Sequence, residues 1–361
     1  MDKVYFNRNW IFIKNKKNIF LYNFVSSKEL LIDKYIEPSI YLLKSFSSTD
    51  YGHIQEIFKD FKNKFQNLDK KWFTDSLKQL RKRGIIKDIK KKPRDLTQQY
   101  LLGLDRQIDY LEDLFPNKNK YQIQKGLKDT KIAILGLGSV AQSIIQCLVA
   151  SGIGNYVCVD FDVVEERNIG RQPIFRKTDI GKTKANAIKK YIEESRYGNK
   201  VKVFNKMIKS PKDVEQMIID CDVVLQCCDY PRFVVHRWIN NACLKLKKPN
   251  LLVHAGRIGP LSIPYKSSCY GCLEKFYEKH FIAYKDIKKI IISEGFGRYP
   301  TLSIIPSITG VIAAKEVIAF LLGMSHDSHN AFLDIEPYTL QTTKHILKRQ
   351  KNCHACGRNK K

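Results

Sequence analysis

The sequence lacks a hydrophobic run long enough to cross a membrane as a helix. Its uninterrupted apolar stretches stop short of the roughly 18 residues that such a span needs. Residues 1–17 mix lysine and asparagine with apolar side chains, and they lack the small-residue cleavage site of a secretory signal. We therefore expect a cytoplasmic protein without a membrane partner.

Acidic residues are also scarce. The chain has 36 Asp and Glu against 63 Lys and Arg, which gives a formal net charge of +27. Nucleic acid, an acidic membrane or an acidic peptide could each account for such a charge. The lysines are spread along the chain instead of forming one block, which favours a general compositional bias. We therefore expect no nucleic-acid partner.

The most informative stretch lies between residues 131 and 184. Residues 132–135 have the pattern of a buried strand, Gly136 and Gly138 follow, and a helical segment begins next. A second apolar run, residues 156–159, ends at Asp160. A strand, a glycine turn, a helix and a strand that ends at an acid are typical of a nucleotide-binding unit. The glycines admit phosphate, and the acid accepts hydrogen bonds from ribose.

Three more strands are predicted downstream, at residues 201–204, 221–227 and 250–256, with helices at 179–195 and 307–322. We therefore predict an α/β fold for residues 93–361, with a Rossmann-like, mostly parallel sheet. Ligands of such sheets bind outside the carboxyl ends of the strands. Asp160, the glycine turn and Asp229, which follows the fourth strand, should therefore meet in one crevice.

A dehydrogenase also has a glycine turn and an acid, so these features alone do not define the chemistry. Arg171, Lys184 and Arg94 supply more positive charge than a dinucleotide requires, and Asp229 offers an oxygen ligand suited to Mg²⁺. This set suits a triphosphate under nucleophilic attack, because cations stabilise the charge that develops on the phosphates. Further polar residues could orient phosphate or ribose oxygens: Asp162, Asn168 and Gln172.

Four of the ten cysteines form two C-x₂-C pairs. Cys269 and Cys272 make the first pair, and Cys353 and Cys356 make the second. Two such pairs in a cytoplasmic protein indicate a four-thiolate zinc site. A disulfide or redox role fits a reducing compartment less well. With four protein ligands the zinc has no open position, so we predict a structural role.

Residues 1–92 form a separate, smaller domain in this interpretation. Two short strands, at residues 4–13 and 18–25, precede helical segments and a turn at Gly84. This order suggests a winged helix. Such a domain reads DNA, binds a peptide by adding it as a strand to a sheet edge, or serves as a packing module, and the three alternatives stay open here.

The motifs together resemble those of the ThiF, MoeB and ubiquitin-activating superfamily. They occur in the family's order: R-x₃-Q from Arg94, GLGSVA, SGIG, DFD, N-x₂-RQ from Asn168, GKTK, CCDYP, CYGC and CHAC. The resemblance implies adenylation of a C-terminal carboxylate with ATP and Mg²⁺, usually in a homodimer.

Within that superfamily the chain is most similar to the MccB-like enzymes. The segment GPLSIPYKSSCYGC and the small N-terminal domain carry this similarity. It implies that residues 1–92 are a winged-helix-like peptide-recognition domain, or peptide clamp. The substrate would then be a ribosomally made precursor peptide in bacteriocin biosynthesis.

The resemblance also implies a role for each site residue. Gly136 and Gly138 lie under the nucleotide, and Asp160 holds the ribose. Asn168, Arg171 and Lys184 contact phosphates, Gln172 supports them, and Asp229 binds Mg²⁺. Arg94 reaches the phosphates in the partner subunit.

The chain departs from the family's GxGGxG turn at two positions. Ala141 is a mild change, because that position only packs the helix on the strand. Ser139 lies where the backbone approaches the α-phosphate and could reshape nucleotide binding. Two other functions remain: a peptide-binding scaffold without catalysis that serves a partner modifying enzyme, and an activator of a ubiquitin-like sulfur carrier.

Overall fold

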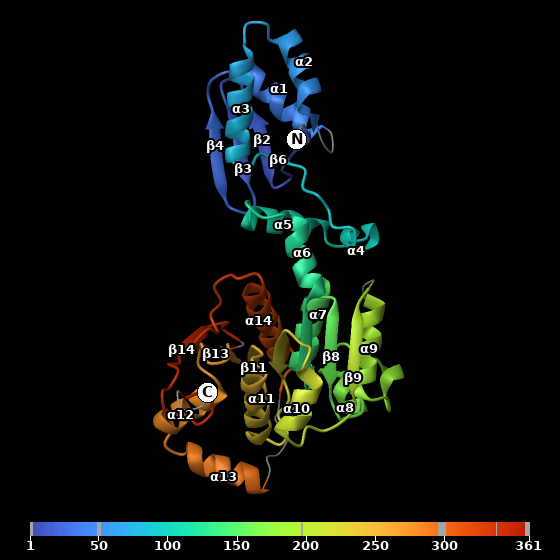
Figure 1. Ribbon diagram of the computed structural model, residues 1–361, viewed down its shortest axis with the longest axis vertical. Coiled ribbons are helices and arrows are strands. Elements are labelled where there is room, and N and C mark those ends of the chain that lie inside the picture. Colours follow the sequence, from blue (N-terminus) through green and yellow to red (C-terminus); the bar gives the residue numbers. More distant parts are fainter. Residues whose placement is uncertain (1–2, 49–51, 196–197, 295–300, 337, 358–361) are drawn as a thin grey trace. The chain divides into compact units, whose positions relative to one another are not determined.

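The computed structural model describes residues 3–48, 52–195, 198–294, 301–336 and 338–357. The chain divides into two compact units, Met1–Gly126 and Leu127–Lys361. Figure 1 draws the first in blue and teal and the second from green to red. The functional boundary after residue 92 stays a prediction, and each unit is described by itself.

The first unit contains a winged-helix-like arrangement. A small antiparallel sheet has the order β5-β1-β6. It accompanies three helices, and the elements are β1 (Lys3–Phe6), α1 (Ile36–Ser47), β5 (Gly52–His53), α2 (Ile54–Lys64), α3 (Lys70–Lys82) and β6 (Ile86–Asp88). Gly84 ends α3 with a φ of 71°, as expected for a glycine just past a helix.

A second antiparallel sheet completes this domain, with the order β2-β3-β4. Its strands are β2 (Trp10–Lys14), β3 (Ile19–Asn23) and β4 (Lys28–Ile32). Trp10, Ile19 and Leu21 are buried in one core with side chains of the helices, among them Phe46 and Phe61. Both outer strands, β2 and β4, are edges within the described residues of this sheet.

The strand predicted over residues 4–13 is in fact two strands that belong to different sheets. The side chain of Asn7 causes the break. Its Oδ1 accepts a hydrogen bond from the Asn9 N–H at 3.1 Å, and its Nδ2 donates to the Gly84 carbonyl at 2.9 Å. Such a turn of the chain around an asparagine side chain is favoured over continued strand.

Residues 93–126 belong to the first unit and carry short helices instead of one long one. Two of them are α4 (Gln98–Leu102) and α5 (Asp105–Leu114), and α6 (Lys120–Asp129) follows. The ammonium group of Lys120 lies 2.9 Å from Asp109 and 3.0 Å from Glu112. Tyr5 donates a hydrogen bond to the same Glu112, so α5 is tied to strand β1.

The second unit is built on an eight-stranded sheet with the order β14-β13-β12-β11-β10-β7-β8-β9. Strands β9, β8, β7, β10 and β11 are parallel to their neighbours, and β12 to β14 extend the sheet antiparallel. The bounds are β7 (Lys131–Leu135), β8 (Asn155–Val159), β9 (Lys200–Phe204), β10 (Val223–Gln226), β11 (Asn250–His254), β12 (Arg257–Ser262), β13 (Ala331–Ile335) and β14 (Thr342–Ile346). This confirms the predicted fold class.

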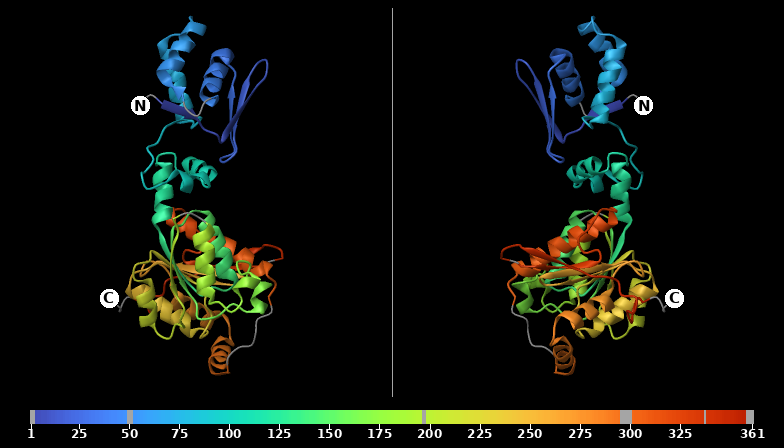
Figure 2. Two further views of the ribbon diagram at one scale, coloured as in Figure 1. Left: turned by 90° about the vertical axis from the view of Figure 1, so that its right-hand side faces the viewer. Right: turned by 90° about the vertical axis from the view of Figure 1, so that its left-hand side faces the viewer.

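Helices cover both faces of the sheet (Figure 2). On one face α10 (Pro211–Ile218) and α11 (Val234–Lys245) share a core with alternate residues of β7, β8 and β10. On the other face α7 (Ser139–Ala150) contacts both α9 (Lys184–Ser195) and α14 (Ile304–Leu321). The remaining helices are α8 (Glu166–Ile169), η1 (Lys177–Asp179), α12 (Tyr270–His280) and α13 (Tyr284–Glu294).

Helix α14 is long and apolar and packs within the second unit. Among the described residues it is the one helix whose 18 residues and mean hydropathy of 1.8 would suffice for a membrane span by length and composition. Lys315 and Glu316 interrupt its apolar run. In the structure 44% of this helix is buried, and it packs along α7.

Close packing of α14 on α7 depends on Gly310. A Cβ added there would lie 2.5 Å from the Ser143 Cβ and 2.7 Å from the Val140 carbonyl oxygen. We expect Gly310→Ala to lower the free energy of unfolding by about 1–3 kcal/mol, because this overlap outweighs the better helix propensity of alanine. Urea denaturation measures the change.

Gly126 in α6 is the matched control, because a Cβ added there meets no atom within 4 Å. Gly126→Ala should leave stability unchanged or raise it by up to about 1 kcal/mol. Equal stability of the two variants would refute the proposed role of Gly310 in the α7–α14 contact.

Candidate functional site

The site lies where the strand order of the sheet reverses. From β7 the chain moves outward through β8 to β9, and it then returns to the other side of β7 to form β10 and β11. In sheets of this kind ligands bind at the carboxyl ends of the strands beside such a reversal, which here are β7 and β10. Gly136 follows β7, and Asp229 follows β10 by three residues.

The two glycines of the turn have different reasons to be glycine. Gly136 has a φ of +91°, and a Cβ there would lie 2.5 Å from the Cys228 nitrogen. The contact between the two loops therefore requires glycine. Gly138 precedes α7, and a Cβ there would meet no atom within 4 Å. The protein's own packing does not need Gly138, which fits a position kept open for a ligand.

The N-terminus of α7 begins at this open position. Its first N–H groups and its helix dipole favour an anion. Ser139 is the first helical residue and is partly exposed, whereas Ala141 is fully buried. The hydroxyl of Ser139 can add a hydrogen-bond donor at the helix end, and Ala141 fills core space.

Asp160 holds the glycine loop in place. Its Oδ2 accepts a hydrogen bond from the Leu137 N–H at 2.7 Å, and its Oδ1 accepts one from the Asp162 N–H at 2.9 Å. Burial raises the pKa of Asp160, and the nearby Lys184 opposes this rise. Each carboxylate oxygen keeps one lone pair, so the acid can still accept ribose hydroxyls.

Lys184 and Asp162 form an ion pair. The ammonium group of Lys184 lies 2.6 Å from Asp162 Oδ2, and Lys184 is only 7% exposed. The Lys184 N–H also donates to the Asp162 carbonyl at 3.0 Å. The cation is thus held at the start of α9 beside Asp160, where it can exchange Asp162 for a phosphate.

The segment around α8 carries the other three polar residues. Asn168 is buried, and its Oδ1 accepts a hydrogen bond from the Glu165 N–H at 2.9 Å, which caps α8. Gln172 is buried, and its Oε1 accepts one from Gln142 Nε2 at 3.4 Å. Arg171 is partly exposed, and its guanidinium has no side-chain partner within the described part of the chain.

Gln142 was not foreseen from the sequence. It is fully buried in α7, and its Nε2 also lies 3.4 Å from the Leu137 carbonyl oxygen. Its Oε1 accepts a hydrogen bond from the Ile174 N–H at 2.9 Å. Gln142 therefore links the glycine loop to the segment that carries Arg171. The signal that could have revealed Gln142 from the sequence is a single amide side chain on the apolar face of the predicted helix.

Asp229 lies at the mouth of the crevice. Its side chain is 68% exposed, and Oδ2 lies 3.4 Å from the guanidinium of Arg232. Two aromatic rings follow the two acids, Phe161 after Asp160 and Tyr230 after Asp229. They are 44% and 59% exposed, with centroids 6.3 Å apart. These rings, which the sequence analysis did not single out, offer apolar surface for a base or a peptide.

Arg94 lies in an exposed turn of the first unit. The other predicted site residues all belong to the second unit. The structure therefore brings together the glycine turn, Asp160, Asp162 and Lys184 by direct bonds, and it leaves Arg94 outside this set. Its contact with phosphates stays a prediction.

The four paired cysteines form one buried cluster. Cys269 and Cys272 lie at the start of α12, and their sulfur atoms are 4.0 Å apart. Cys269 lies 3.7 Å from Cys353, and Cys272 lies 3.6 Å from Cys356. These distances are far longer than a disulfide bond. They match the spacing of about 3.8 Å expected for four sulfurs at 2.3 Å from one tetrahedral Zn²⁺.

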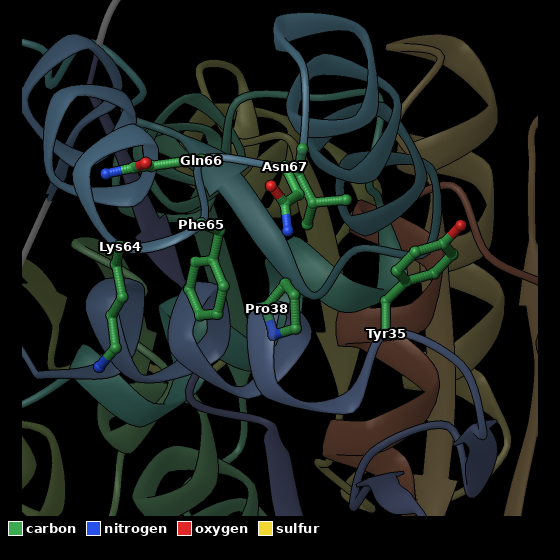
Figure 3. A pocket seen from close by; sticks show the side chains of 7 residues that line it. Tyr35, Pro38, Lys64, Phe65, Gln66 and Asn67 are labelled. Atoms are coloured by element: carbon green, nitrogen blue, oxygen red, sulfur yellow. The ribbon is translucent and has the colours of Figure 1, made fainter.

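The first unit has a hollow of about 420 Å³ where the start of α1 meets the connection between α2 and α3 (Figure 3). Its lining comprises Tyr35, Pro38 and residues 64–68. Aromatic rings, amides and the ammonium group of Lys64 surround it, so it could hold a polar or aromatic side chain of another molecule.

Comparison with known proteins agrees with this geometry. A model of the ThiF family matches residues 104–356. The molybdopterin-synthase adenylyltransferase of Escherichia coli K12 is 24% identical over 267 residues, which cover 73% of this chain and 99% of that enzyme. A UBA4 adenylyltransferase and sulfurtransferase of Lodderomyces elongisporus is 27% identical over 68% of this chain. The chain spans about half of that protein's length (52%).

Among solved structures the chain is similar to E. coli MccB with ATP. The TM-score is 0.71 at 21% identity, and the match covers 98% of this chain and 100% of MccB. MccB has also been solved with N-formylated MccA, with a TM-score of 0.70. At this identity the likeness establishes the fold. The family match covers well over half of the chain and confirms the family inferred from the motif order: the chain belongs to the ThiF family, a family of adenylyltransferases.

Proposed function

We propose that the protein uses ATP and Mg²⁺ to adenylate the C-terminal carboxylate of a ribosomally made precursor peptide, with release of pyrophosphate. The observation that carries this proposal is the pairing of two parts in one chain. The residues around Lys184 and Asp160 form a connected set that suits phosphates, and a separate winged-helix-like unit precedes them in the chain. The similarity to MccB, a protein solved with the MccA peptide, extends over both parts.

In the proposed reaction a carboxylate oxygen of the peptide attacks the α-phosphorus of ATP. A new O–P bond forms, the bond to the β-phosphate oxygen breaks, and its electron pair leaves with pyrophosphate. Lys184 and Arg171 stabilise the negative charge on the phosphates. Asp229 would hold Mg²⁺, which when bound neutralises the leaving group.

The peptide would bind to the first unit. Strands β2 and β4 offer free edges to which an extended peptide can add. The hollow beside Tyr35 would accept one of its side chains. We also infer a homodimer in which Arg94 of one subunit reaches the phosphates held by the other, and a cytoplasmic location.

A second candidate is activation of a ubiquitin-like sulfur carrier. The similarity to the E. coli molybdopterin enzyme, which covers nearly all of that protein, favours it. The catalytic step is the same, and the substrate is then a small protein. A scaffold without catalysis is disfavoured by the assembled set of Asp160, Lys184 and Arg171.

The substrate class is tested by pyrophosphate release. The protein is incubated with Mg·ATP and one of three substrates: peptides encoded beside its gene, the same peptides as C-terminal carboxamides, or a Gly-Gly sulfur carrier. We expect release with free-carboxylate peptides only. Pyrophosphate release with the carrier protein alone would establish the second candidate. If no substrate gives pyrophosphate, the function of a non-catalytic peptide-binding scaffold is favoured instead.

Lys184→Ala should reduce kcat for pyrophosphate release by about 100-fold or more, because it removes a cation from the developing charge. Lys189→Ala is the control on the same helix. Lys189 is partly exposed and pairs with Glu193 on the surface of the helix. Initial rates at saturating ATP measure both, and full activity of the Lys184 variant would refute its role.

Asn67→Trp should fill the hollow of the first unit and weaken peptide binding by about 10-fold or more, since an occupied pocket costs the peptide its contacts. Asn63→Trp places the same ring on the exposed side of α2, away from the lining. Isothermal titration with an accepted peptide gives the affinities. Equal affinities would argue against the hollow, and the KM for ATP should not change.

The cysteine cluster would hold a structural Zn²⁺ that ties the C-terminal tail to α12. Gln350 and Ala355 donate N–H groups to the sulfurs of Cys272 and Cys353, both at 3.4 Å, which supports thiolates. We expect one zinc per chain by elemental analysis. Cys272→Ser should lose it together with several degrees of thermal stability, and Cys147→Ser should keep it. Full zinc content in Cys272→Ser would contradict this site.

A further inference from the structure

A histidine at the end of β11 lies level with the loop of Asp229 and has no assigned role. His254 is the last residue of this strand, next in the sheet to β10. In the parallel ladder Gln226 pairs with Leu252, so His254 lies two residues beyond, level with the loop that carries Asp229. Its side chain is partly exposed.

The imidazole of His254 has unused hydrogen-bonding capacity. Within the part of the chain that the structure describes, neither ring nitrogen has a hydrogen-bond partner. A neutral imidazole offers one donor and one acceptor. Burial lowers the pKa of His254 to about 4. The Asp229 carboxylate opposes this, and Arg232 and Arg257 add to it. The ring is therefore neutral near pH 7.

A buried polar chain fixes the position of this ring. Gln226 Nε2 donates to Asn250 Oδ1 at 2.5 Å, which sets the orientation of the Gln226 amide. Its Oε1 then faces His236 Nδ1 at 3.3 Å, so that nitrogen carries the proton. The His236 ring in turn meets His254 edge to face, with centroids 4.8 Å apart and planes at 88°.

The buried His236 beneath His254 destabilises the fold relative to an apolar ring in the same place, so packing alone does not explain it. His236 is 2% exposed, and its Nε2 is buried without a partner among the described residues. A buried nitrogen without a hydrogen-bond partner destabilises the folded state. An apolar ring would fill the same space without that penalty. The polar chain therefore points to a function for the group it supports, which is His254.

We propose that His254 donates a hydrogen bond to the C-terminal carboxylate of the substrate and orients it for attack on the α-phosphorus. This inference rests on the proposed function. A neutral donor suits the task, because an ammonium or guanidinium partner would withdraw more charge from the attacking oxygen. The imidazole keeps its proton throughout: the O–P bond forms, and pyrophosphate leaves with the electron pair of the broken bond.

His236 and Gln226 are positioning residues in this scheme, because they touch His254 or its support and not the substrate. Asp229 and Arg232, on the adjacent loop, and Arg257, the cross-strand partner of His254 in β12, are the charged groups that act on this ring.

The test uses the full-length protein with Mg·ATP and a pooled library of short synthetic peptides that end in each common amino acid. Pyrophosphate release is followed for wild type, His254→Ala, His254→Gln and the control His280→Ala, whose ring lies exposed at the end of α12. Melting temperatures and the KM for ATP are measured in parallel.

We expect His254→Ala to lower kcat/KM for the peptide by about 10- to 100-fold, the value of one hydrogen bond to a charged group. Its KM for ATP and its melting temperature should stay unchanged. His254→Gln, which keeps an N–H donor, should recover part of the loss, and His280→Ala should behave as wild type. A merely structural role would instead lower the melting temperature and impair ATP binding equally.

Two other results would overturn the inference in distinguishable ways. If wild type releases pyrophosphate and His254→Ala matches it, the role of His254 is wrong and the proposed function stands. If wild type releases no pyrophosphate with any peptide, the proposed function is wrong, and so is the role of His254 that depends on it.

Discussion

The close approach of Gly136 to Cys228 is the constraint on which the site depends. The two residues follow neighbouring strands, β7 and β10, and only a glycine lets their backbones meet. This contact brings the glycine loop and the loop of Asp229 to the same edge of the sheet. Asp160 then secures the loop through Leu137, and Gln142 connects it to the segment of Arg171. Candidate site residues on three separate segments are thereby connected.

The core of the second unit could be predicted from sequence because its strands are buried on both faces and appear as short apolar runs between turns. The first unit was harder. Strand β4 (Lys28–Ile32) alternates exposed and half-buried residues and contains Lys28 and Glu29, so its apolar signal is weak. The break at Asn7 depends on Gly84 and Asp113, which are far away in sequence. The local sequence pattern does not indicate such distant hydrogen-bond partners.

In the candidate site, too, some features could be predicted from local sequence and others depend on residues far away in sequence. The glycine turn, Asp160 and Lys184 stand out because their residue types follow strand ends in a recognisable order. The sequence did not indicate that Asp162 pairs with Lys184, because an ion pair depends on how two loops fold back on each other. His254 was missed for a related reason. A lone histidine after a strand is unremarkable until its neighbours His236 and Gln226 are seen to support it.

The ion pair between Lys184 and Asp162 also affects which anions the crevice accepts. Without nucleotide, the buried cation is already neutralised, so a free phosphate or sulfate must compete with a carboxylate 2.6 Å away. Under the proposed function, a triphosphate would have to displace Asp162 from Lys184 before its own oxygens could pair with this cation. The ion pair would thus disfavour simple anions, because an anion that displaces Asp162 leaves this carboxylate without its cation.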